Sequence, residues 1–210
     1  MILFMRPRLY NALPSQYERL LRRNLNLSEQ EAKRVMKVYP LSKYGNKPRD
    51  AFGYILTDLS LACPSYLGLD SVAEKGLPTY YYRFDYNRMK GGKSLGAFHS
   101  SEIPFVFNSL DQKPFTVFYD EKNIGPAKEL SRIIQSYWVN FAKTGDPNGP
   151  GLPEWPGYEP ESKMVQVLDL TVKSEQTDMN ERCVVWDGYA KTRQPIFENL
   201  ARKEKGRGKK

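Results

Sequence analysis

The sequence predicts an α/β fold that is mostly helical, with only two or three strands of an incomplete sheet. Apolar residues recur at helical spacing in residues 16–25 and, most strongly, in 126–143. Residues 79–86 are rich in aromatic residues that favour strands, and residues 164–170 alternate between apolar and polar. Two or three strands leave sheet edges that need partners. We therefore expect the chain to be one part of a larger fold.

Capping and breaking residues define the helices of the first half. Ser28 and Glu31 have the spacing of a capping box, which predicts a helix over residues 28–38. Residues 47–63 predict another helix, whose apolar positions are dense enough for burial on most sides. Pro64 is expected to interrupt that helix, because proline has no amide proton and its ring clashes with the preceding turn.

In the second half, residues 87–101 are expected to form a loop, and the apolar residues 102–107 to pack inward. The helix at 126–143 ends in turn residues that begin at Gly145, and a last short helix is expected at 181–191. The apolar face of the 126–143 helix consists of Ile133, Ile134, Tyr137, Trp138 and Phe141.

The composition is that of a packed globular chain, with 210 residues, 40% hydrophobic and 13% aromatic. No segment approaches the roughly 20 apolar residues that span a bilayer, and the N-terminus does not have the pattern of a signal peptide. Of the net charge of +8, the tail 200–210 contributes +5, with six basic residues and one acidic residue. We expect one domain over 1–199, then a disordered, solvated tail. One short basic run does not indicate a nucleic-acid partner.

The two cysteines, Cys63 and Cys183, lie in no C-x-x-C or C-x-x-H spacing, so no zinc or other metal site is expected. The residues alone allow either two buried thiols or one disulfide. Gly92-Lys93-Ser94 resembles the end of a phosphate-binding loop, but that motif needs a glycine five residues before Gly92, where this chain has Asn87. No cofactor is therefore expected from this loop.

The same loop spells G-x-S-x-G over residues 92–96, the nucleophile motif of serine hydrolases. That motif places the serine on a strained turn between an incoming strand and an outgoing helix. Here the preceding strand is expected to end near Tyr86, and no helix is expected after Ser94. His99 follows after only five residues, whereas these hydrolases place an acid and then a distant histidine after the serine. We do not assign Ser94 as a nucleophile.

Residues 96–108, GAFHSSEIPFVFN, resemble the histidine loop of the type-B carboxylesterases, a family of α/β hydrolases that includes the cholinesterases and related lipases. Residues 82–85 resemble the strand before that loop, and residues 138–148 resemble the helix and turn after it. Trp155-Pro156, Cys63-Pro64 and the run from Cys183 to Trp186 are also similar to the family, so the resemblance covers roughly residues 1–190.

The resemblance implies the C-terminal part of an α/β-hydrolase fold that acts on carboxylic esters, with His99 as the catalytic general base. It implies for Glu102 a supporting hydrogen bond behind the site; the alternative is a carboxylate at the start of a short helix. The family's nucleophilic serine, oxyanion hole and acid have no counterpart here, since residues 1–4 resemble the run that follows the acid. Four aspartates are in the wrong segments to be that acid: Asp50, Asp58, Asp70 and Asp85.

The family also implies a disulfide between Cys63 and Cys183, and a secreted or periplasmic location for the whole enzyme. Without a signal peptide, the chain as given would be cytoplasmic. The leading interpretation is a fragment of a serine carboxylic-ester hydrolase, inactive alone, whose partner is the missing N-terminal portion of the same fold. The alternative is a non-catalytic, esterase-like binding or adhesion module.

Overall fold

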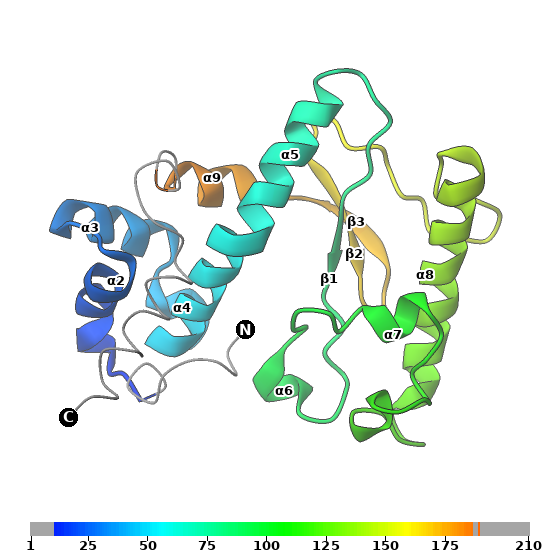
Figure 1. Cartoon of the computed structure of the whole chain (residues 1–210), viewed down its shortest axis with the longest axis horizontal. Coiled ribbons are helices and arrows are strands. Elements are labelled where there is room, and N and C mark those ends of the chain that lie inside the picture. Colours follow the sequence, from blue (N-terminus) through cyan, green and yellow to red (C-terminus); the bar gives the residue numbers. More distant parts are fainter. Residues whose placement is uncertain (1–10, 187–188, 190–210) are drawn as a thin grey trace, which may run out of the picture. The chain divides into compact units, whose positions relative to one another are not determined.

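The structure, a computed structural model, describes residues 11–186 and residue 189 (Figure 1). The chain divides into two compact units. Unit 1 combines Met1–Tyr66 with Asp178–Lys210, and unit 2 is Leu67–Thr177. The expected domain end at residue 199, the tail 200–210 and the run 1–4 all lie outside the described residues.

Unit 1 is helical in the part of the chain that the structure describes. Its core is made of apolar side chains from all of its α-helices, including Leu21, Val35, Phe52 and Ile55, which are at most 1% exposed. Its helices are α2 (Tyr17–Leu25), α3 (Glu29–Val38), α4 (Pro48–Thr57) and α9 (Met179–Val184), with short 3-10 turns at Pro14–Gln16 and Leu41–Tyr44 and the start of α5 (Cys63–Ala73).

The capping box at the start of α3 is confirmed. The Ser28 hydroxyl accepts a hydrogen bond from the Glu31 amide at 3.3 Å, and the Ser28 amide donates to the Glu31 carboxylate at 2.7 Å. Two amide groups that would lack a partner in an isolated helix end are thereby satisfied. The helix predicted over 16–25 is likewise confirmed as α2.

The prediction that Pro64 interrupts its helix is wrong. The helix continues from α4 through a π-helical segment, Asp58–Ala62 (labelled η4), into α5. The Cys63 amide bonds to the carbonyl of Asp58, five residues back, so the turn before the proline is one residue wider than an α-turn. Pro64 follows directly after this wider turn, so the helix continues past a residue that has no amide proton to donate.

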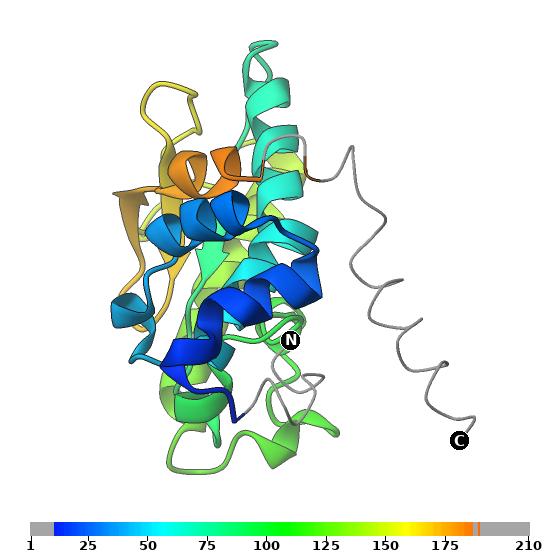
Figure 2. The same cartoon turned by 90° about the vertical axis from the view of Figure 1, so that its left-hand side faces the viewer.

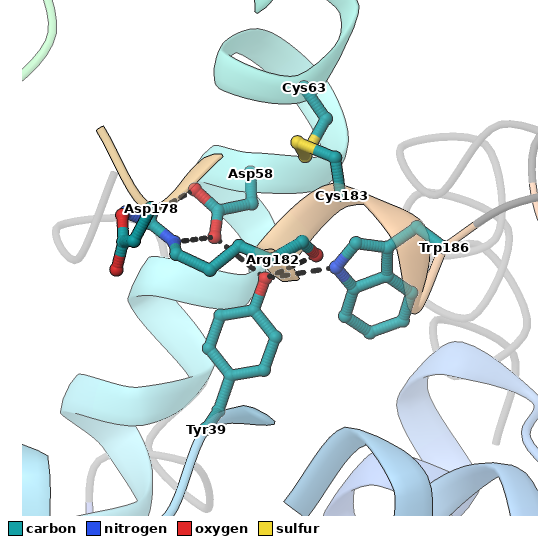
Figure 3. Close-up of a disulfide and its surroundings, with 7 residues drawn as sticks. All are labelled: Tyr39, Asp58, Cys63, Asp178, Arg182, Cys183 and Trp186. Carbon is teal, nitrogen blue, oxygen red and sulfur yellow. Dashed lines mark hydrogen bonds and ion pairs between the residues drawn. A yellow bond between two sulfur atoms is a disulfide. The ribbon is translucent and has the colours of Figure 1, made fainter. Parts of the chain in front are cut away.

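The disulfide between Cys63 and Cys183 is present, with the two Cα atoms 5.4 Å apart (Figure 3). It joins the first residue of α5 to α9, across a sequence separation of 120 residues. The alternative of two free thiols, which the residues alone left open, does not apply to this structure. The bond fixes the position of α9 within unit 1.

A buried carboxylate lies beside the disulfide, in the π-helical segment (Figure 3). Asp58 has no exposed surface, and it accepts hydrogen bonds from Arg182 Nε at 2.9 Å and from the Tyr39 hydroxyl at 2.7 Å. Trp186 Nε1 donates to the same hydroxyl at 3.0 Å, and Arg182 also pairs with Asp178. Burial and the negative charge of Asp58 raise the pKa of Tyr39, so its hydroxyl stays protonated and acts as a donor.

Unit 2 contains a three-stranded sheet in the order β1-β2-β3 (Figure 1). β1 (Tyr82–Phe84) pairs in parallel with β2 (Met164–Leu168), which pairs antiparallel with β3 (Lys173–Gln176). Both predicted strands are present, although each is shorter than predicted. β3 was not predicted, because its sequence KSEQ is polar throughout and lacks the residues that favour strands.

The long helix α8 (Ile124–Thr144) covers the sheet and confirms the helix predicted at 126–143. Ile134 and Tyr137 on its apolar face are fully buried, whereas Phe141 at the end of the predicted face is exposed. Gln166 of β2 donates to the Tyr137 hydroxyl at 3.2 Å, which ties the helix to the sheet. No helix among the described residues is long and apolar enough to cross a membrane.

Arg182→Met is expected to lower the free energy of unfolding by about 3 kcal/mol, because it leaves the buried Asp58 carboxylate without its charge partner. Asp178→Asn is the matched control, since it removes the exposed partner of the same arginine and should cost less than about 1 kcal/mol. Urea unfolding measures both. Equal losses in the two variants would show that burial of Asp58 does not matter.

Replacing both Cys63 and Cys183 by serine is expected to lower the free energy of unfolding by about 4 to 5 kcal/mol. The bond closes a long loop, and its removal returns the corresponding conformational entropy to the unfolded chain. Urea unfolding of the oxidised protein and the variant measures this loss. Alkylation of the unreduced protein provides an independent check, and two reactive thiols there would contradict the disulfide.

Candidate functional site

His99, the only histidine of the sequence, lies in unit 2 on the turn between two short helices, α6 (Gly92–Leu95) and α7 (Ile103–Val106). Its side chain is exposed, and no described residue forms a hydrogen bond or ion pair with it. The preceding Phe98 anchors the turn, because its ring packs 5.5 Å from the ring of Phe118 and against the core of unit 2. The imidazole is thus exposed to solvent, and the packing of Phe98 holds the backbone next to it.

The helical turn α6 corrects the prediction that residues 87–101 form a loop without helix. Ser94 lies inside this turn, ten residues after the end of β1, and not at a junction where a strand leads into a helix. The structure therefore does not give Ser94 the position that the nucleophile motif requires.

A structural reason requires glycine at both glycine positions of the G-x-S-x-G motif. A Cβ atom on Gly92 would lie 1.8 Å from the carbonyl oxygen of Asn87, so only glycine fits there. Gly96 has φ +64° and ψ −164°, a conformation that is essentially restricted to glycine. The motif in this loop is therefore explained by close packing and by the end of α6, without a catalytic serine.

Each of the two residues after His99 has a feature that is energetically unfavourable in the folded chain. Ser100 has φ +70°, a left-handed conformation that is unfavourable for a side chain with a Cβ atom. Ser101 is 5% exposed, and its hydroxyl has no hydrogen-bond partner among the described residues. No sequence signal pointed to these residues, because serine is not the residue that usually marks a positive φ.

Glu102 is half-buried at the N-cap position of α7, but its carboxylate caps no amide of that helix. Its backbone carbonyl accepts from the amide of Phe105 at 2.9 Å. Burial and, second, the negative charge of Glu102 raise the pKa of Tyr82 in β1. His99 and Glu102 share one turn, yet no hydrogen bond joins them.

The aspartates that the sequence excluded as the catalytic acid are engaged elsewhere. In unit 1, Asp50 pairs with Arg49 and Asp58 with Arg182. In unit 2, Asp70 accepts a hydrogen bond from the Tyr158 hydroxyl at 2.9 Å, and Asp85 forms an ion pair with Arg83. Within the described residues, no group of three or more His, Cys, Asp or Glu side chains could hold a metal ion.

Comparisons with known proteins agree on the family. The model of the carboxylesterase family matches residues 8–186. Carboxylesterase 5A of Felis catus is 35% identical over 142 residues, which is 66% of this chain and 26% of the relative. Para-nitrobenzyl esterase of Bacillus subtilis (strain 168) is 32% identical over 154 residues, which is 72% of this chain and 29% of the relative. The chain spans about a quarter of the length of these relatives.

The fold comparison gives the same result. The crystal structure of a Geobacillus stearothermophilus carboxylesterase at pH 6.2 is similar with a TM-score of 0.66 and 26% sequence identity. The similarity covers 86% of this chain and 36% of that structure. The predicted fold class is confirmed: the chain has part of an α/β-hydrolase fold, largely helical with a small three-stranded sheet.

Ser100→Gly is expected to raise the free energy of unfolding by about 0.5 to 1 kcal/mol, because glycine adopts the positive φ without strain. Ser100→Ala is the matched control, since it removes the hydroxyl and keeps the Cβ atom. Urea unfolding compares the two variants with the parent chain. If alanine stabilised as much as glycine, the hydroxyl and not the backbone would be the source of the cost.

Proposed function

Because the chain belongs to the carboxylesterase family, we propose that it carries the histidine-bearing, C-terminal part of a serine carboxylic-ester hydrolase. The observation that carries the proposal is the position of His99. The only imidazole of the sequence is exposed, and it lies on a turn that holds a strained Ser100 and a buried Ser101 hydroxyl with no partner among the described residues. Such costs persist where the surrounding structure enforces them, and they cluster at functional sites.

In this proposal His99 is a general base and then a general acid. One imidazole nitrogen takes the proton of a serine hydroxyl as the serine oxygen attacks the ester carbonyl. The imidazolium then protonates the leaving alkoxide, which departs as the alcohol and leaves an acyl-serine. The imidazole next takes a proton from water as the water oxygen attacks the acyl group. The imidazolium then returns this proton to the serine oxygen, which releases the carboxylic acid and regenerates the free serine and the neutral imidazole.

The remaining catalytic groups are proposed to come from a segment outside these 210 residues, the N-terminal portion of the same fold. A lone imidazole has no positioned nucleophile, no oxyanion donors and no carboxylate to hold its tautomer. Ile103 and Phe107 of the α7 region present large apolar side chains to solvent next to the histidine turn, with Phe107 75% exposed. This surface is suited to contact with such a segment.

Glu102 is proposed as a positioning residue behind His99. Its carboxylate is half-buried, and it shares the histidine turn. We also propose that the whole enzyme folds in an oxidising compartment, because the Cys63–Cys183 bond is of the kind that persists in secreted and periplasmic proteins. The ester substrate is a small molecule, and the residues that would select it are proposed to lie mostly in the other segment.

The test is a chimera of the Bacillus subtilis para-nitrobenzyl esterase in which this chain replaces the matched segment. We expect the chimera to hydrolyse p-nitrophenyl acetate with saturation kinetics, and His99→Ala to lower its kcat by a factor on the order of 10⁴ or more. Ser94→Ala is the control, and it should leave kcat unchanged. The isolated chain should show no hydrolysis above background.

Two outcomes would contradict the proposal. Hydrolysis that survives His99→Ala in the chimera, or that Ser94→Ala abolishes, would remove His99 from the mechanism. A chimera that unfolds cooperatively but shows no activity would favour the alternative, a non-catalytic esterase-like binding module.

A further inference from the structure

The charge of the chain is divided unequally between the two units. Unit 1 holds 20 Lys and Arg residues against 10 Asp and Glu, a net charge of +10, whereas unit 2 holds 12 against 14, a net charge of −2. The described part of unit 1 holds 10 basic and 7 acidic residues, so its own excess is +3. The basic tail therefore explains only part of the asymmetry, and the folded part contributes as well.

Helix α2 has one apolar face and one arginine face. Tyr17, Leu21 and Leu25 follow at intervals of four residues and are at most 1% exposed, so they define the buried side of the helix. At 3.6 residues per turn, Arg19 and Arg23 then lie on the opposite side. Arg22 lies beside them, and all three arginines are exposed. The solvent side of α2 is thus a row of guanidinium groups.

These arginines line a shallow groove. Arg19, Arg22, Arg23 and the buried Leu27 line an open hollow of about 320 Å³. Arg22 also pairs with Glu18 at 3.5 Å, but a guanidinium has five N–H donors and keeps others for a ligand. Three guanidinium groups beside one hollow supply planar pairs of N–H donors, the kind of group with which arginine binds oxyanions.

The adjoining helix α3 extends the basic surface. α2 and α3 lie side by side in both views (Figures 1 and 2). Ala32 and Val35 form the buried side of α3, so Lys33, Arg34 and Lys37 lie on its solvent side, where all three are exposed. Only one of these, Lys33, forms an ion pair with an acidic residue of its own helix, Glu29. The α2–α3 pair therefore presents six basic side chains.

We propose that the arginine groove of α2, together with the basic side of α3, binds a sulfated polysaccharide. A linear polyanion matches the charge of the surface and gains affinity by releasing its counterions. The groove contains no aromatic side chain on which a nucleic-acid base could stack. This choice of polyanion rests on the oxidising compartment proposed above from the disulfide, since sulfated glycans are linear polyanions of the extracellular space.

The test measures binding of the full chain to a fluorescent heparin oligosaccharide at several NaCl concentrations. The variant R19Q/R22Q/R23Q is expected to raise Kd by about tenfold or more and to lower the slope of log affinity against log salt by about 2, since three ionic contacts are lost. The matched control K93Q/K122Q/K143Q removes the same charge from exposed positions of unit 2 and should leave Kd unchanged.

Two further variants keep the result decisive. Deleting residues 200–210 should leave the effect of the arginine substitutions intact, because the groove and not the tail carries the binding. If the circular dichroism of R19Q/R22Q/R23Q shows that it has lost helix, the single variant Arg19→Glu replaces it, since Arg19 lies at the centre of the solvent side of α2. Unchanged heparin affinity in the groove variants, loss of binding on tail deletion alone, or tighter groove-dependent binding of single-stranded RNA or phosphatidylserine vesicles would each overturn the proposal.

Discussion

Phe105 is the residue on which the position of the histidine turn depends. Its ring is fully buried and lies 4.9 Å from the ring of Phe84 in β1 and 6.0 Å from that of Tyr119. Its carbonyl accepts a hydrogen bond from the Ser131 hydroxyl of α8 at 2.6 Å. One residue of α7 thus joins the sheet, a loop and the long helix, and the turn that carries His99 leads directly into it. The core of unit 2 thereby holds the backbone of the turn that carries the imidazole.

The glycine-rich loop shows how a functional motif can arise from packing. Gly92 is required because it lies against the Asn87 carbonyl, and Gly96 is required because its backbone conformation excludes a side chain. With Ser94 between them, these two constraints reproduce the letters of a nucleophile motif. The absence of a strand-to-helix junction at Ser94, which the sequence predicted, is confirmed, whereas the helical turn that contains Ser94 was not predicted.

The predictable parts of the fold are those determined by local residues. The capping box at Ser28 and the apolar spacing of α8 identified their helices, because capping and burial act over a few residues. The predictions that were missed or wrong concern features that depend on distant residues or on an unusual helical turn. β3 is polar and forms only because β2 supplies its hydrogen bonds, and Pro64 fits its helix only because the preceding turn is a π-turn. The family resemblance predicted the cysteine pair, which the structure confirms, whereas the catalytic role of His99 stays a prediction. No local pattern predicted the positive φ of Ser100.

Different kinds of interaction stabilise the two units. In unit 1 a buried carboxylate, Asp58, is satisfied by Arg182 and Tyr39 immediately beside a covalent cross-link, so the ends of a long chain segment are held by both charge and disulfide. In unit 2 the histidine turn is held by aromatic packing. Burial of the neighbouring apolar side chains offsets the unfavourable φ of Ser100 and the buried Ser101 hydroxyl without a partner among the described residues. A strained, exposed turn can persist there because the packed residues around it hold its backbone.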